Sequence, residues 1–282
     1  MKKSSPLAGE DTGGGCFWLR SQTWLSECRF YTPPTLTLPR KGEGKFVARS
    51  PLCPRQAGLL YSGVATLTGS TDVETTMKLY WSSRSPYVRK VMIAAHETGL
   101  ADRLDCERTI VSAFAENADM LTVNPLGKIP TLVLDDGMVL YDSPVICEYL
   151  DGLHDGPKLF PPAGSARFTA LRWLALGDGM LDMLLARMYE ERTRTEEQRS
   201  QKLQDAIVVK LKTCLDALDG MAGELTATPV SIGHIAIACA IGYLDFRFAS
   251  DNWRAGRPAL AAWHKSFAAR PSVVATEPED VY

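Results

Sequence analysis

Hydrophobic positions in the stretch that starts near Met77 follow first a strand pattern and then a helix pattern. The apolar run Leu79-Tyr80-Trp81 predicts a short strand over residues 78–81. After Pro86, apolar residues recur at the i, i+3, i+4, i+7 spacing of a core-facing helix stripe. Residues 104–110 predict a second strand, and a looser segment follows. This order predicts a right-handed crossover that joins two parallel strands.

Two further apolar runs, residues 131–134 and 138–141, flank the turn sequence Asp135-Asp136-Gly137 and predict an antiparallel hairpin. The next helix is predicted to begin at Asp142-Ser143-Pro144, with Ser143 as its N-cap and Pro144 at the first helical position. A βαβ unit followed by a ββα unit is the order of a thioredoxin-like sheet, which we assign to residues 77–156.

After Pro161-Pro162 the pattern is helical only. Amphipathic spacing predicts a long helix over residues 168–187 and another over 203–225. Ser231 is expected to cap the apolar helix around residues 235–244, and a last helix ends before Pro271. We therefore predict an α/β domain followed by an all-helical domain over residues 165–278.

The first 76 residues are rich in Gly, Pro, Ser and Thr and have no sustained period of 2 or 3.6. We interpret them as a weakly ordered leader or an extended gene start, because Met77 resembles a natural start. A functional tail is the alternative.

Composition narrows the function classes. The net charge of -2 over 282 residues gives no reason to expect a nucleic acid or an anionic membrane as the main partner. The longest apolar run near the C-terminal end, residues 235–244, is about half the length that spans a bilayer. The seven cysteines and four histidines show no metal-ligand or disulfide-framework spacing, so we expect no metal and a reducing cytoplasm.

The junction Ser85-Pro86-Tyr87 stands out chemically, because it places a serine where a strand ends and a helix begins. Free backbone N–H groups and the helix dipole favour a negative charge at such a corner. The group that benefits most is a thiolate. From the residues alone, Ser85 could equally be a plain N-cap.

Residues 77–278 resemble a bacterial cytosolic glutathione transferase of the serine type. The resemblance is carried by Ser85-Pro86-Tyr87, by residues 124–130 (Asn-Pro-Leu-Gly-Lys-Ile-Pro), by Asp142-Ser143, by the apolar helix around residues 235–247 and by Arg270-Pro271-Ser272. It implies a thioredoxin-like glutathione-binding domain, an all-helical domain, glutathione as co-substrate and a homodimer.

The resemblance also implies a glutathione site. Pro130 would be cis and leave the backbone of Ile129 free to pair with the cysteinyl part of glutathione. Asp142 and Ser143 would hold its γ-glutamyl end, and Lys128 would reach its glycine carboxylate. Alone, these residues are typical of a trans proline at a strand start, an N-cap serine with a solvated aspartate, and a solvated lysine.

Ser85 would donate a hydrogen bond to the sulfur of glutathione. A free thiol has a pKa of about 8.5, so a donor that stabilises the thiolate makes the bound sulfur a better nucleophile at neutral pH. Tyr80, Ser82 and Ser83 are competing donors. A cysteine at position 85 would allow thiol-disulfide exchange, which serine does not, so the transferase is favoured over the reductase.

The predicted function is therefore the transfer of glutathione to a small hydrophobic electrophile. The alternatives are a non-catalytic binding protein with the same fold and a glutathione-dependent peroxidase or reductase. The electrophile is expected between the two domains, against the first long helix. Residues within range there are Asp178, Leu181, Asp182, Leu185, Arg187, Met188 and Tyr189.

One position departs from the family pattern. Where the central helix of the family has an aspartate three residues after its capping Ser or Thr, this chain has His234 after Ser231. The negative charge that favours a helix start is missing, so we expect a cap weaker by about 0.5–1 kcal/mol than an aspartate version.

Overall fold

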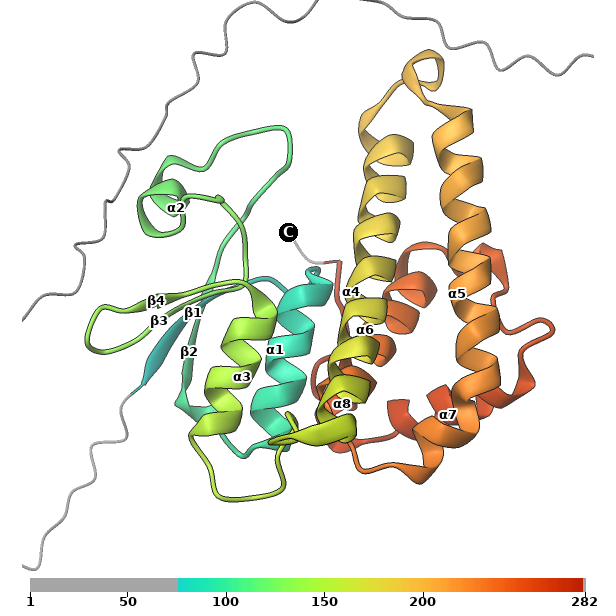
Figure 1. Ribbon diagram of the computed structural model, residues 1–282. Coiled ribbons are helices and arrows are strands. Elements are labelled where there is room, and N and C mark those ends of the chain that lie inside the picture. Colours follow the sequence, from blue (N-terminus) through green and yellow to red (C-terminus); the bar gives the residue numbers. More distant parts are fainter. Residues whose placement is uncertain (1–75, 281–282) are drawn as a thin grey trace, which may run out of the picture. The chain divides into compact units, whose positions relative to one another are not determined.

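The computed structural model describes residues 76–280. The interpretation of the N-terminal segment as a leader therefore lies outside the described residues. In the first half of the described chain, a four-stranded sheet has the order β2-β1-β3-β4, and three helices accompany it (Figure 1). These elements are β1 (Met77–Trp81), α1 (Pro86–Glu97), β2 (Leu104–Arg108), α2 (Ala118–Val123), β3 (Thr131–Val133), β4 (Val139–Leu140) and α3 (Ser143–Gly152).

The strand register confirms the thioredoxin-like sheet. β1 pairs with β2 in parallel and with β3 in antiparallel, where Tyr80 lies opposite Thr131. β3 and β4 form the predicted antiparallel hairpin, with Leu132 opposite Leu140. Alternate β1 side chains are buried, including Met77 and Leu79, because this face of the sheet packs against the helices.

Two element boundaries in this half differ from the prediction. β2 ends at Arg108 rather than at residue 110, because Arg108 pairs with Trp81, the last residue of β1, and the ladder then has no further partner. Ile110 is accordingly 63% exposed. In the segment expected to be loose, α2 forms, and the side chain of Asn117 caps it by accepting a hydrogen bond from the N–H of Met120 at 3.0 Å.

The second half is helical, as predicted. It comprises α4 (Gly164–Thr193), α5 (Gln201–Ala227), α6 (Ile232–Arg247), α7 (Pro258–Ala268) and α8 (Pro271–Val274), with 3-10 turns at Ala101–Arg103, Glu196–Gln198 and Ala249–Asp251 in the described chain. α4 extends beyond the predicted 168–187 at both ends. Half of the added residues are exposed and only Glu190 is buried, so the pattern of buried apolar positions could not mark them.

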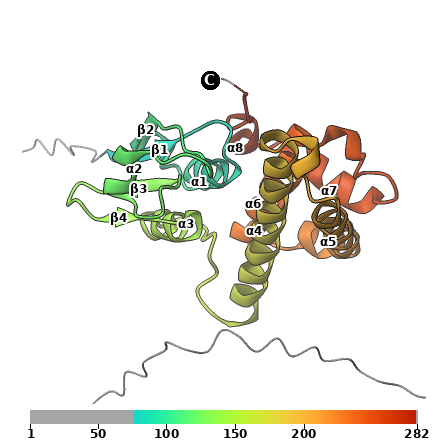
Figure 2. The ribbon, with the colours of Figure 1, turned by 90° about the horizontal axis from the view of Figure 1, so that it is seen from above.

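α6 is the centre of the helical half. Figure 2 shows it next to α4, with α1 on one side and α5 and α7 on the other. α4 and α6 approach closely at two glycines: a Cβ at Gly177 would lie 2.5 Å from the backbone of Ala236, and one at Gly233 would lie 2.6 Å from Trp173. Side chains at these positions would force the two helices apart.

His234 takes over the capping role at the start of α6. Its Nδ1 accepts a hydrogen bond from the backbone N–H of Ser231 at 3.1 Å, and its Nε2 lies 3.1 Å from the carbonyl oxygen of Leu225 near the end of α5. Burial lowers the pKa of His234, so the ring is neutral and one nitrogen accepts while the other donates. The weaker cap relative to aspartate stays a prediction.

Both ends of α1 are joined to the helical half by polar contacts. Near its C-terminal end, Glu97 accepts hydrogen bonds from Arg270 at 2.7 and 2.9 Å and from the hydroxyl of Ser272. Nearer its N-terminal end, Lys90 pairs with Asp178 of α4 at 2.5 Å. No helix within residues 76–280 has both the length and the apolar character to cross a membrane.

Candidate functional site

The register brings three of the predicted segments to one edge of the sheet. β1 ends where β3 begins, because Tyr80 is opposite Thr131, and β4 ends beside the start of β3, because Leu140 is opposite Leu132. The segments that follow β1, precede β3 and follow β4 therefore converge there. They carry Ser85, residues 128–130, and Asp142 with Ser143.

Ser85 is the N-cap of α1, as the sequence predicted. Its Oγ accepts a hydrogen bond from the N–H of Val88 at 3.3 Å. A hydroxyl that accepts in this way keeps its own proton for donation, so the capping and donating roles are compatible. The position also lies at the positive end of the helix dipole, where an anion is favoured.

The competing donors have other contacts. Ser83 donates its hydroxyl proton to the carbonyl oxygen of Glu279 at 3.0 Å, and Ser82 Oγ lies 3.4 Å from the backbone N–H of Arg84. Tyr80 lies within β1, with the ammonium of Lys78 4.9 Å from its ring centroid. Ser85 is the one of these four that caps α1.

The loop before β3 is organised by a residue to which the sequence analysis gave no role. The Ile129-Pro130 peptide bond is cis, as expected. Asn124, which is 1% exposed, donates from its side-chain amide to the Lys128 carbonyl oxygen at 3.1 Å and to Thr131 Oγ at 2.9 Å. Asn124 therefore fixes the loop on both sides of Ile129 and Pro130. The side chain of Lys128 is exposed.

The start of α3 differs from the prediction by one residue. Asp142, not Ser143, is the N-cap, because the carbonyl oxygen of Asp142 accepts the first helical hydrogen bond, from Ile146 N–H at 3.1 Å. The carboxylate of Asp142 makes no capping bond and is exposed, whereas Ser143 is 1% exposed. The Asp142 carboxylate therefore makes no hydrogen bond to the start of α3 and is accessible to solvent.

Acidic side chains gather where α1 faces α4. The hydroxyl of Tyr87 donates to the carboxylate of Asp182, and Lys90 donates to Asp178. Burial raises the pKa of Tyr87, and its hydrogen bond to Asp182 and the nearby charges of Asp178 and Asp142 raise it further. Tyr87 therefore stays protonated and serves as a donor.

The pKa of Asp178 reflects both its burial and the charges around it. Burial raises it, the attraction of Lys90 opposes that rise, and the neighbouring Asp142 and Asp182 add to it, so that the pKa lies above its usual value. Lys90 is paired with Asp178, and the carboxylates of Asp142 and Asp182 are further negative charges near that pair. Such a cluster favours a cationic group, such as the ammonium of a γ-glutamyl moiety.

The residues predicted for an electrophile site on α4 divide into groups. Leu181 is fully buried in the core. Arg187 pairs with Glu191 and Asp251, and its guanidinium lies 4.1 Å from the ring centroid of Phe248, so it serves the helical half. Leu185 and Met188 pack partly buried against the core, and Tyr189 contacts the ring of Phe114 at 5.4 Å. Asp178 and Asp182 face α1.

The sequence pattern did not reveal the contact of Lys90 with Asp178. It lies between the core positions Val88 and Val91 and is itself 0% exposed. A lysine so close to an apolar helix stripe was the available signal, because burying its charge requires a partner.

The buried cysteines near these helices are poor nucleophiles. Burial raises the pKa of Cys147 to about 12 and that of Cys239 to about 11. Both thiols therefore stay protonated at neutral pH, and only a thiolate attacks. Neither of these two cysteines therefore supplies a reactive sulfur at neutral pH.

This chain belongs to the glutathione S-transferase family, whose members join a thioredoxin-like domain to an all-helical domain. Residues 84–153 match its N-terminal domain and residues 201–266 its C-terminal domain. The GST-like protein YibF of Escherichia coli strain K12 is 35% identical over 208 residues, which are 72% of this chain and 98% of YibF.

Solved structures agree. A glutathione transferase family member from Pseudomonas fluorescens Pf-5, crystallised with bound glutathione, is 42% identical with a TM-score of 0.70, and the match covers 72% of this chain and 100% of that one. A second crystal structure from the same organism, at 41% identity, a TM-score of 0.68 and the same coverage, contains S-(propanoic acid)-glutathione.

Proposed function

We propose that this protein is an enzyme that binds glutathione, holds its sulfur as a thiolate and transfers it to a small hydrophobic electrophile. One observation carries the proposal: Ser85, the loop of residues 128–130, and Asp142 with Ser143 converge at one edge of the sheet. Glutathione bound in structurally similar family members supports it.

In this proposal each segment holds one part of glutathione. The backbone of Ile129 pairs with the cysteinyl unit, beside cis Pro130. Asp142 meets the ammonium of the γ-glutamyl unit, and Ser143 with the N-terminal N–H groups of α3 meets its carboxylate. The exposed Lys128 reaches the glycine carboxylate.

Ser85 provides the chemistry. Its hydroxyl donates a hydrogen bond to the sulfur while the N-terminus of α1 adds a favourable potential, and both stabilise the thiolate over the thiol. The sulfur then forms a bond to the electrophilic carbon as the leaving group departs. The serine is a donor throughout and forms no covalent bond.

The test is glutathione binding and turnover with a panel of electrophiles, for wild type and Ser85→Ala. We expect glutathione binding to be retained in Ser85→Ala and turnover to fall roughly 10²-fold or more, the size of effect seen when a single stabilising donor is removed. Ser83→Ala is the matched control. Tight glutathione binding without turnover of any electrophile would contradict the enzyme and favour a binding protein.

A relative's ligand suggests what the electrophile looks like. The S-(propanoic acid)-glutathione bound in the second P. fluorescens structure is a glutathione whose sulfur carries a short acid. We propose that the electrophile pocket of this protein also accepts short carbon chains that end in a carboxylate. Alkylating acids therefore belong in the panel beside neutral aromatic electrophiles.

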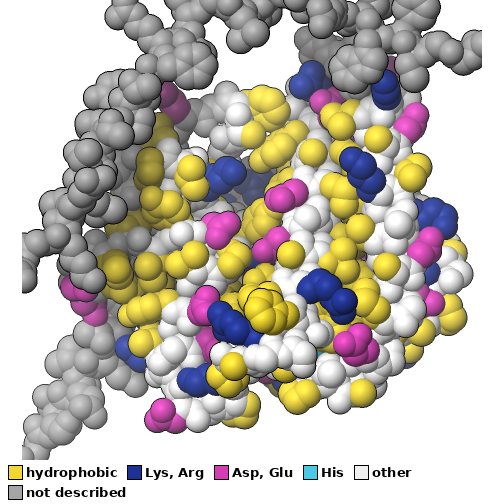
Figure 3. Space-filling model, in the orientation of Figure 1, with side chains coloured by type: hydrophobic (Ala, Val, Ile, Leu, Met, Phe, Trp, Pro, Cys, Tyr) yellow, Lys and Arg dark blue, Asp and Glu magenta, His cyan; other side chains and the backbone are white. Residues whose placement is uncertain are grey.

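We further propose that the protein is a cytoplasmic homodimer that removes reactive electrophiles. Figure 3 shows hydrophobic side chains exposed on the face that carries α3 and α4. On these two helices, Val145 of α3 is 45% exposed and Phe168 of α4 is 72% exposed. Light scattering of the full chain tests the dimer, which a monomer at micromolar concentration would contradict.

A further inference from the structure

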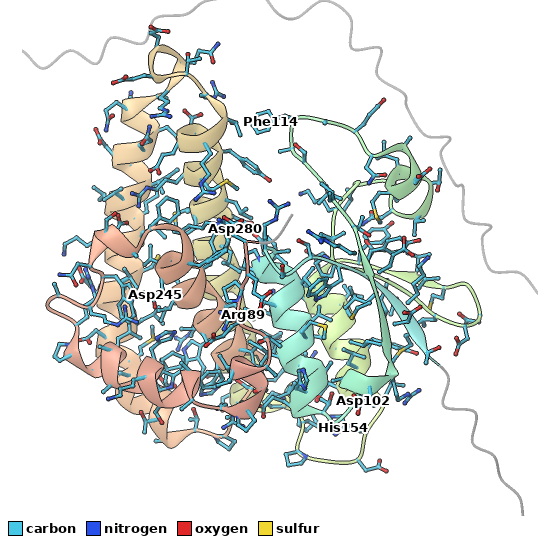
Figure 4. The ribbon with its side chains drawn as sticks, turned by 180° about the vertical axis from the view of Figure 1, so that it is seen from behind. Arg89, Asp102, Phe114, His154, Asp245 and Asp280 are labelled. Atoms are coloured by element: carbon cyan, nitrogen blue, oxygen red, sulfur yellow. The ribbon has the colours of Figure 1, made fainter. Side chains whose placement is uncertain are left out.

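The C-terminal segment of the described chain lies against the corner that holds Ser85. Pro278, Ser85, Arg89 and Tyr243 are among the residues that line a cavity of about 10 Å³, room for about one water molecule. The next residue, Glu279, accepts the hydroxyl hydrogen bond of Ser83 through its carbonyl oxygen. Figure 4 shows the labelled Asp280 beside the start of α1.

Asp280 is held by a buried arginine. Its carboxylate accepts two hydrogen bonds from Arg247, the last residue of α6, at 2.9 and 3.2 Å. The side chain of Arg247 is 7% exposed, and its Nε is buried without a hydrogen-bond partner in the described chain. The hydrogen bond from Arg247 lowers the pKa of Asp280, and the nearby charges of Arg192 and Arg84 lower it further.

The two partners of this ion pair differ in their burial. The cation is buried, which is costly, whereas the carboxylate that compensates it is 42% exposed and lies close to the end of the chain. The Arg247 guanidinium is rigid and planar and fits a carboxylate with two parallel hydrogen bonds. A ligand carboxylate could take the place of Asp280 with little change in the rest of the protein.

Arg247 and the corner that holds Ser85 are connected through α6 and through the C-terminal segment. Tyr243, which shares the small cavity with Ser85, is one helical turn before Arg247 on the same face of α6. Pro278 is two residues before Asp280, and two residues of extended chain span at most about 7 Å. A carboxylate on Arg247 would therefore lie on the same face of α6 as the cavity beside Ser85.

We propose that Arg247, with Arg192 and Arg84 close by, is the subsite for the carboxylate of an acidic electrophile, and that the carboxylate of Asp280 occupies it until that electrophile binds. The proposal rests on the proposed function and names its substrate class: short halogenated carboxylic acids. The sulfur forms a bond to the halogen-bearing carbon, the carbon–halogen bond breaks, and the halide leaves with the bonding electrons. The thiol proton passes to solvent.

The experiment measures binding and does not depend on turnover. Calorimetry compares S-(2-carboxyethyl)glutathione with S-propylglutathione, which has the same length without the charge, on the full-length protein. We expect the acid to bind roughly tenfold more tightly to wild type, the size of one charge-assisted hydrogen-bonded pair. In Arg247→Met the preference should fall to about one, and Arg247→Lys should retain part of it. Asp280→Asn should increase it severalfold, because the competing carboxylate is gone.

Arg254→Met is the matched control. Arg254 follows α6 and makes a bidentate pair with Asp245 on that helix, so its loss should leave the preference unchanged. Equal affinities in wild type, or an unchanged preference in Arg247→Met, would overturn the subsite. If Asp280→Asn lowered the preference for the acid, the proposal that the ligand carboxylate displaces Asp280 from Arg247 would be wrong. Turnover of 3-bromopropanoate and 3-bromopropanamide is measured separately: a binding preference without turnover would contradict the enzyme and leave the subsite standing.

Discussion

Glu97 and Asp178 are two carboxylates that join α1 to the helical half, and their pKa values move in opposite directions. Burial raises the pKa of Glu97, but hydrogen bonds from Arg270 and Ser272 outweigh it, so the net pKa is below its usual value. The pKa of Asp178 stays above its usual value although Lys90 donates to it. Each carboxylate has one cationic partner, so the partner alone does not explain the difference.

The surroundings explain it. Burial is the main cause of the raised pKa of Asp178, and the negative charges of Asp142 and Asp182 add to it, whereas Glu97 has the hydroxyl of Ser272 as an additional donor. The contact near the end of α1 is electrostatically complete and joins the two halves. The cluster near the start of α1 is incomplete in the folded chain, as expected where a cationic group of a ligand is to bind.

The largest effect should come from Lys90→Met. It leaves the partly buried Asp178 carboxylate without its cation, so we expect the free energy of unfolding to fall by about 3 kcal/mol at pH 7, measured by urea denaturation. Since the folded pKa of Asp178 is raised, the loss should diminish as pH falls through that pKa and the carboxylate is protonated.

The double variant Lys90→Met with Asp178→Leu is the control. It replaces both charges with apolar groups, and we expect it to recover most of the stability. A double variant as unstable as the single one would show that the loss arises from packing and not from an unpaired charge.

Glu97→Gln should have a smaller effect with a different pH range. The folded pKa of Glu97 is lowered, so its stabilisation is present above its unfolded pKa of about 4.3 and is lost as pH falls through the folded value. We expect a loss of about 2 kcal/mol at pH 7 that diminishes only below about pH 4. If the stability loss of Glu97→Gln diminished over the same pH range as that of Lys90→Met, the proposed difference between the contacts at the two ends of α1 would be wrong.

Asp142→Asn should have the smallest effect and should act on ligand binding. The carboxylate is exposed, so its attraction for the glutathione ammonium is screened, and we expect about fivefold weaker binding by calorimetry. Glutathione that lacks the γ-glutamyl amino group is the matched ligand. It should bind both proteins equally, and a fivefold loss with this ligand too would assign Asp142 a structural role.

Much of this architecture is readable in the sequence because local patterns determine it. The spacing of apolar residues predicts β1, α1 and the helical half, and Ser85 followed by Pro86 predicts the start of a helix. The sequence does not reveal the roles of residues that act through side-chain contacts with other segments. The roles of Lys90 and Asn124 follow from partners 88 and 7 residues away, and the segment that carries Asp280 from a partner on α6.

The start of α6 is an intermediate case. The sequence identifies His234 as the residue that replaces the expected acid, and from this we predicted a weaker cap. The sequence does not show that the second ring nitrogen contacts the carbonyl oxygen of Leu225. An aspartate would be too short to make both contacts, so the two versions differ in more than charge.

The measurement that tests the central claim most directly is the pKa of the glutathione thiol in the complex, read from thiolate absorbance during a pH titration. In wild type we predict a value well below the free-thiol value of about 8.5, and in Ser85→Ala a rise of about 1–2 pH units towards it, the equivalent of one hydrogen bond to a charged group. An equal bound-thiol pKa in both proteins would contradict the role of Ser85 as the donor to the thiolate.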